Sequence, residues 1–126
     1  MIRSLAILFS VLFAFFLNAQ GSLQFDHVHF EQLVSNSGSD PIVDIIVPSG
    51  QVFKLTSASL YRSSNYNLSF KKSAESVYSP IVSNNIDDLS FPIWLPPGSY
   101  HFKLINSCGS CTVSATFSGI FFNVTP

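Results

Sequence analysis

The chain has few charged residues, and their signs nearly balance. Lysine, arginine, aspartate and glutamate make up 10% of its 126 residues, and the formal net charge is −1. So little positive charge provides no electrostatic surface for nucleic acid and no polybasic segment for acidic lipids. Few charges also mean little repulsion between copies of the chain, which favours self-association.

Catalytic motifs are equally scarce. The sequence has no Gly-x-Ser-x-Gly elbow, and it is so rich in serine that chance Ser–His neighbours are inevitable. A Ser/His/Asp triad therefore cannot be argued from it. No segment has the 3.6-residue periodicity of an amphipathic helix. We expect a protein that is not an enzyme and that holds no cofactor.

One long apolar run occurs, and it lies at the N-terminus. Arg3 precedes the run Leu5–Leu17, and Asn18-Ala19-Gln20 then offers a small residue for cleavage. The run is shorter than the roughly 20 residues that a membrane-spanning helix needs. We predict a signal peptide over residues 1–19, a single mature domain over residues 20–126, and no membrane span. The mature protein would be periplasmic, at the cell surface or secreted.

The mature chain has the two-residue periodicity of β-strands, interrupted by Gly, Pro, Asn and Ser clusters. In the expected strand at residues 52–61, Phe53 and Leu55 should share a face with Ser57, Ser59 and Tyr61. Many short strands in one domain predict an all-β, two-sheet antiparallel sandwich of about eight strands, jelly-roll-like rather than immunoglobulin-like. The expected strands are residues 23–31, 42–47, 52–61, 67–71, 77–82, 91–95, 100–105 and 112–118, with the first turn at residues 35–40.

Three segments carry a resemblance to known proteins. Val47–Leu55 has the pattern VPxGxxxKI, Phe91–Tyr100 has the pattern PxWLPxGxY, and Ser118–Val124 has the composition of a closing strand. Over residues 42–126 the chain resembles small exported bacterial β-sandwich proteins. The resemblance implies the sandwich fold. Some similar domains are trimeric fibre heads, so it also makes self-association an expectation.

The cysteines form one Cys-x-x-Cys pair, Cys108 and Cys111. Strand patterns on both sides place the pair at a hairpin tip, without the helix that lowers a thiol pKa in redox enzymes. In an exported protein we expect a disulfide that pins the tip. A redox role and metal binding stay open as alternatives, although zinc would require two further ligands.

The first expected strand carries two histidines. His27 and His29 would lie on one face about 6.6 Å apart, and Glu31 continues that face. We expect Val28 and Phe30 to face the core, which would leave the histidines and the glutamate on the exposed side of the sheet.

Cupins, which are metal-binding jelly rolls, carry a related His-x-His and Glu set and a later Pro-x-Gly-x-x-His segment. His27, His29 and Glu31 resemble the first set, and His101 ends a segment like the second. Glu31 follows His29 more closely than in the cupin pattern, the separation between the two halves also departs from it, and no strand precedes His27. We therefore expect no metal site at these four residues.

Aromatic side chains supply the expected core and two kinds of candidate surface. Trp94, Tyr61 and Tyr66 are candidates for stacking on sugar rings, although we expect Trp94 to pack beneath a turn. Phe121 and Phe122 are adjacent, so one must leave the core, and both are candidate interface residues. The phenylalanines expected in the core are Phe25, Phe30, Phe53, Phe70, Phe91, Phe102, Phe117, Phe121 and Phe122.

These patterns favour an exported, non-enzymatic structural or protein-interaction module that forms homo-oligomers. The alternative is a cell-surface carbohydrate-binding module, and a cupin-like metal protein is a third, weaker reading. The partner would be another copy, a glycan or a surface protein. The direction of the tyrosine and tryptophan rings distinguishes the first two readings, because a sugar site requires a flat exposed aromatic strip.

Overall fold

A computed structural model describes residues 21–36, 38–61, 66–83 and 91–126. The expected signal peptide lies outside these ranges. Within them no residue is helical, and no helix is long and apolar enough to cross a membrane.

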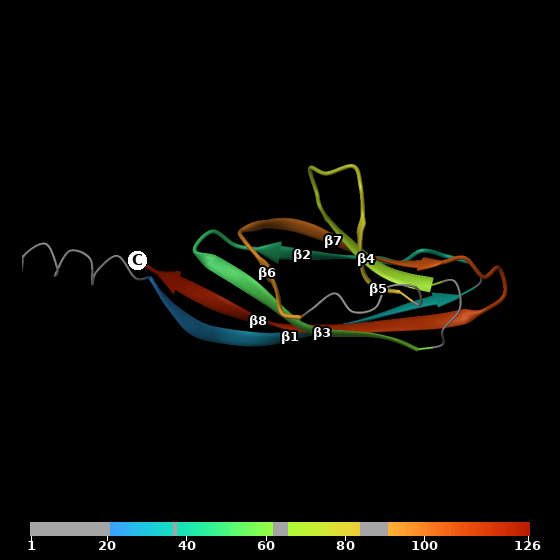
Figure 1. Ribbon diagram of the computed structural model, residues 1–126, viewed down its shortest axis with the longest axis horizontal. Helices are drawn as coiled ribbons and strands as arrows, with labels where there is room; N and C mark the ends of the chain where they lie inside the picture. The colour runs from blue at the N-terminus through green and yellow to red at the C-terminus, as the bar shows by residue number, and fades with distance from the viewer. Residues whose placement is uncertain (1–20, 37, 62–65, 84–90) are drawn as a thin grey trace, which may run out of the picture.

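Eight strands form two antiparallel four-stranded sheets that pack as a sandwich (Figure 1). The first sheet has the order β1-β8-β3-β6 and the second the order β2-β7-β4-β5. The predicted all-β, two-sheet sandwich is confirmed. The strands are β1 (Ser22–Asn36), β2 (Ile42–Val47), β3 (Gln51–Tyr61), β4 (Tyr66–Lys72), β5 (Ser79–Ser83), β6 (Ile93–Leu95), β7 (Gly98–Asn106) and β8 (Thr112–Thr125).

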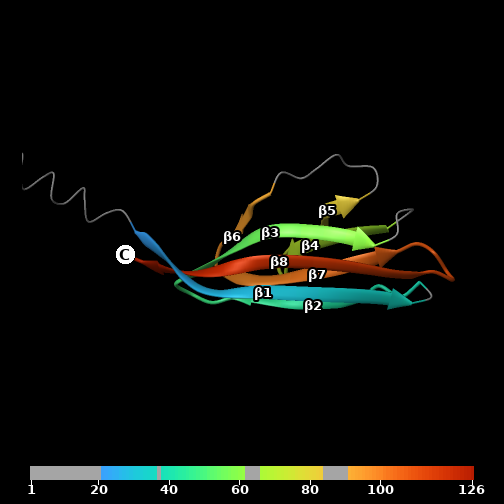
Figure 2. The ribbon, with the colours of Figure 1, turned by 90° about the horizontal axis from the view of Figure 1, so that it is seen from below.

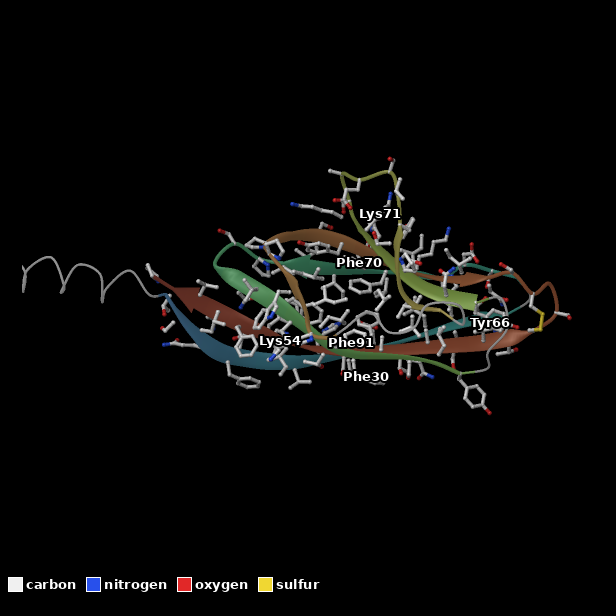
Figure 3. The ribbon with its side chains drawn as sticks, viewed as in Figure 1. Phe30, Lys54, Tyr66, Phe70, Lys71 and Phe91 are labelled. Carbon is white, nitrogen blue, oxygen red and sulfur yellow. A yellow bond between two sulfur atoms is a disulfide. The ribbon has the colours of Figure 1, made fainter. Side chains whose placement is uncertain are left out.

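The core follows the predicted alternation on β7 and β8. Phe102 of β7 and Phe117 of β8 are buried and stack across the two sheets, with ring centroids 4.4 Å apart. Phe53 and Phe121 are also buried, and Phe70 packs against the core from β4 (Figure 3). The core prediction therefore holds for most of the phenylalanines. It is wrong for Phe25 and Phe30, which are largely exposed, and for Phe122, which is half-buried on the opposite side of β8 from Phe121.

A bulge in β3 corrects the face predicted for its second half. The register against β8 shifts between Leu55 and Ser57, so the strand loses its simple alternation there. Beyond the bulge Ala58 faces the core with Phe53 and Leu55, while Ser57 and Tyr61 face solvent. One extra residue in a strand moves every later side chain to the opposite face.

The orientation of β1 is the reverse of the predicted one. Leu33 and the fully buried Ser35 face the core, and alternation along the strand then turns His29 inward as well. Val28 and Phe30 point outward and are 62% and 63% exposed. Figure 3 shows Phe30 on the far side of the first sheet from the second sheet.

A buried asparagine fixes the C-terminal end of β1. Asn106 donates from Nδ2 to Oγ of Ser35 at 2.9 Å and to the carbonyl of Cys111 at 3.2 Å. Its Oδ1 accepts the N–H of Cys108 at 2.9 Å, and its own N–H donates to Asp40 at 2.9 Å. Because these contacts keep Ser35 inward, β1 continues to Asn36 and enters the region where a turn was expected.

Gly119 provides a test of the packing between β8 and β3. A Cβ atom there would lie 2.2 Å from Cζ of Phe53 and 2.7 Å from the backbone oxygen of Lys54. We expect Gly119→Ala to lower the free energy of unfolding by about 1–3 kcal/mol, because a buried ring must move. Gly109→Ala is the control, since nothing lies within 4 Å of its added Cβ. Equal urea midpoints for the two variants would contradict this packing.

Candidate functional site

The outer face of the first sheet carries a cluster of exposed and half-buried apolar side chains. We call the cluster the apolar patch, and its members are Phe25, Val28, Phe30, Ile120, Phe122 and Trp94. The strand register brings them together: Phe25 pairs with Phe122, and Val28 pairs with Ile120. Figure 2 looks onto this face, with β1 along one edge of the sheet.

The other half of the same face is polar. Ser57 of β3 lies 2.8 Å from Ser118 of β8 between their hydroxyl oxygens, and Ser59 lies 2.7 Å from Thr116 in the same way. These cross-strand hydroxyl pairs satisfy one another and present little apolar surface. Most of the exposed apolar side chains of this face therefore lie in one part of it, while Val34 and Tyr61 lie in the polar half.

Trp94 lies at the margin of the patch and is 46% exposed, so the expectation that it packs beneath a turn is wrong. Its indole ring is occupied by protein neighbours. Nζ of Lys54 lies 5.2 Å from the ring centroid, and the Phe122 ring lies 5.9 Å away. Both contacts restrict access of a flat ligand to the indole.

The two tyrosines expected to help bind sugar do not join Trp94. Tyr66 is buried in the core, which corrects its assignment as a ligand candidate. Tyr61 is 69% exposed but lies further along β3 than Lys54, the partner of Trp94, by about 20 Å at the usual strand rise. These aromatic rings do not form a continuous strip.

Adjacent Phe121 and Phe122 point to opposite sides of β8, as the alternation requires. Phe121 is 5% exposed and packs on Phe53 at 4.7 Å, so its expected place in an interface is corrected. Phe122 is half-buried on the outer face, where an interface can reach it.

His27 and His29 line a shallow pocket of about 250 Å³ at the open edge between the sheets. The His27 ring stacks on Phe121 with centroids 4.6 Å apart. Nε2 of His29 lies 3.1 Å from Oε1 of Glu31, but the alignment is not that of a hydrogen bond. Among the described residues this buried nitrogen has no hydrogen-bond partner. The face of β1 that carries His27, His29 and Glu31 was predicted to be exposed, but it turns inward and is partly shielded from solvent.

A small polar cluster surrounds Asp26 beside this pocket. Its carboxylate accepts from Nδ1 of His27 at 2.7 Å, from Gln51 at 3.2 Å and from Asn123 at 3.4 Å. The hydrogen bond from His27, followed by those from Gln51 and Asn123, holds the pKa of Asp26 below its usual value. Asp26 occupies the bulged position of β1, between the shifted registers of Phe25 and His27.

His101 belongs to a different contact. Its Nδ1 hydrogen-bonds the carboxylate of Asp44, its cross-strand partner on β2. Asp44 lines the pocket of His27 and His29, whereas His101 is not among the lining residues. Across the described ranges, no three His, Cys, Asp or Glu side chains are placed to hold a metal ion.

Cys108 and Cys111 form a disulfide with their Cα atoms 5.4 Å apart. The pair lies in the connection between β7 and β8, at the hairpin tip that the sequence predicted. Neither cysteine is a free thiol, and Asn106 hydrogen-bonds the backbone of both.

The apolar patch was missed by sequence reasoning because alternation alone does not say which face is inside. Hydropathy favoured the wrong face, because Val34 continues the face of Val28 and Phe30, whereas Leu33 alone adds an apolar residue to the face of His29.

Comparisons with protein family models, with curated proteins and with solved structures gave no match to this chain.

The disulfide should be dispensable for folding. We expect replacement of both Cys108 and Cys111 by Ser to cost about 2 kcal/mol or less, because the closed loop is short and Asn106 also holds it. Asn106→Ala should cost more, since it leaves several buried polar groups without partners. Urea unfolding of both variants measures the difference. A double serine variant that does not fold would contradict this prediction.

Metal analysis tests the histidine region. We expect protein purified without a histidine tag to contain no stoichiometric transition metal, because His27 and His29 lack a suitably placed third ligand among the described residues. Elemental analysis by mass spectrometry measures this. One bound equivalent that disappears in His27→Ala would contradict the prediction and support a cupin-like site.

Proposed function

We propose that this chain is an exported, non-enzymatic protein-interaction module that associates with itself through the apolar patch. The observation that carries the proposal is the reversal of β1. Its aromatic and branched side chains, Phe30 and Val28, lie in solvent, while His27 and His29 face inward. Exposed apolar surface of this kind is typical of interaction sites.

The finer fold assignment that we propose is a jelly roll. The supporting feature is nested antiparallel pairing, in which β1 pairs with β8, β2 with β7, β3 with β6 and β4 with β5. Two-sheet sandwiches of eight strands with this arrangement include many binding and assembly domains. The fold is therefore compatible with a structural role and does not by itself indicate an activity.

Export is proposed on two grounds. The apolar run Leu5–Leu17 after Arg3 has the composition of a signal peptide. The disulfide between Cys108 and Cys111 is compatible with an oxidising compartment. The resemblance of residues 42–126 to exported bacterial sandwich proteins agrees with both. We leave open whether the protein is periplasmic, at the cell surface or secreted.

Carbohydrate binding is the second candidate, and the exposed indole of Trp94 is the feature that favours it. The surroundings favour a protein partner instead. Lys54 and Phe122 crowd the ring, and Tyr61 is too distant to contact the same short oligosaccharide.

Phe30→Ser tests the proposal. We expect the wild-type protein to show a concentration-dependent mass above that of the monomer in light scattering. Burial of one phenylalanine contributes about 1.5–3 kcal/mol, so Phe30→Ser should weaken association by at least about tenfold. Phe122→Ser should have a smaller effect because its ring is already half-buried.

Tyr61→Ser is the matched control, because Tyr61 is equally exposed on the same sheet but lies in the polar half of its face. It should associate as the wild type does. A monomeric wild-type protein at high micromolar concentration would overturn self-association and favour a monomeric binding module. In that case, titration with oligosaccharides and a Trp94→Ala variant would test the second candidate.

A further inference from the structure

We infer that the partner at the apolar patch is a second copy of this chain, paired edge to edge along β1. The inference rests on the proposed function and gives it a geometry. Among the strands that the structure describes, β1 is at the edge of its sheet and pairs only with β8. Two β1 strands would pair antiparallel about a two-fold axis, so that the first sheets of two copies become one continuous sheet.

The backbone of β1 is available for such pairing. Val124 of β8 donates its N–H to the carbonyl of Gly50, on the side of β3. Residues of an antiparallel strand direct their backbone groups alternately to its two neighbours. Phe121 and Gly119 therefore bond β1, and their partners there are His27 and His29.

The residues between these partners have their backbone groups on the open side. Val28, Phe30 and Gln32 direct N–H and C=O away from β8, towards the free edge of the sheet. β1 contains neither proline nor lysine, which commonly block the edges of natural sheets. Its bulge lies near the start of the strand, before His27, and leaves the following residues regular.

Side-chain chemistry favours an axis at Phe30 over an axis at either neighbouring residue. With the two-fold axis at Phe30, Phe30 lies opposite Phe30 of the second copy, and each His29 lies opposite a Glu31. An axis at Glu31 would place two carboxylates opposite each other, and an axis at His29 would place two imidazoles there. A carboxylate accepts a hydrogen bond from an imidazole N–H opposite it, whereas two carboxylates opposite each other destabilise the pairing. Inward-facing charges usually oppose edge pairing, but in this register each carboxylate has a hydrogen-bonding partner.

The same register gives the exposed Phe30 ring a partner. Val28 lies opposite Gln32 of the second copy, and the two Phe30 rings meet at the centre of the joined sheet. The paired segment, His27 to Leu33, ends before the bulge at Asp26 in both copies. Such an interface is isologous, because each copy contributes the same residues.

Gln32→Pro tests the backbone pairing. Proline removes the N–H of Gln32, which is directed to the open edge of the sheet, and edge strands tolerate proline at such positions. We expect this variant to keep the wild-type circular dichroism spectrum and to self-associate at least about tenfold more weakly, since each dimer loses two hydrogen bonds. Gln32→Ala keeps the N–H and should associate normally.

Phe30→Cys tests the register and does not depend on the proline variant folding. A directly paired residue at the axis has a Cα–Cα distance of about 5.5 Å, which suits a disulfide. Under mild oxidation we expect Phe30→Cys to form a covalent dimer, and Val34→Cys, on the same face of β1, to form much less.

The outcomes separate the two proposals. If the wild type does not associate, both fail. If it associates and Phe30→Ser weakens it, but a folded Gln32→Pro associates normally and Phe30→Cys does not cross-link above the Val34→Cys level, the edge pairing is overturned. The proposed interaction function then stands with a different contact geometry.

Discussion

The hydrogen bonds of Asn106 are the constraint on which the orientation of β1 depends. Its side chain ties the hydroxyl of Ser35 to the connection that carries the disulfide. A buried polar group without its partner costs about 1–3 kcal/mol, so rotating Ser35 to the outer face would be unfavourable. Strand alternation transmits this choice from Ser35 to the rest of β1. The inward histidines and the outward Phe30 both follow from it.

Turning histidines inward is tolerated because β1 lies at an edge. His27 stacks on Phe121 and hydrogen-bonds Asp26, while the pocket leaves part of its surface in contact with water. In the middle of the sandwich the same side chains would need full burial. The inward direction of the histidines and the exposure of the apolar residues of β1 therefore both follow from the orientation of this one strand. An exposed apolar surface is obtained without a change in the core.

Much of the fold could be predicted from periodicity, and the candidate site could not. On β7 and β8, uninterrupted alternation identified Phe102 and Phe117 as core residues. On β3 and β1, a single extra residue changes the phase, and nothing in the composition around Thr56 or Asp26 marks these positions as bulges. The hydrogen bonds that fix Ser35 join residues far apart in sequence, so they cannot be predicted from the sequence. Hydropathy alone then assigns Phe30 to the core. The hairpin-tip cysteines were predictable since their contacts are local.

The pairing of Ser22 with Thr125 places the first and last strands in register at one end of the same sheet. A pulling force applied between these two ends would act across the β1–β8 pair and separate its hydrogen bonds one after another. Antiparallel strands resist such unzipping far less than they resist sliding lengthwise, when many bonds must break together. As a mechanical element, the domain would therefore tolerate tension poorly between its own ends. If the protein is attached to another structure only at the end where Ser22 pairs with Thr125, no force acts between β1 and β8. The disulfide tip and the face of the sheet then stay free.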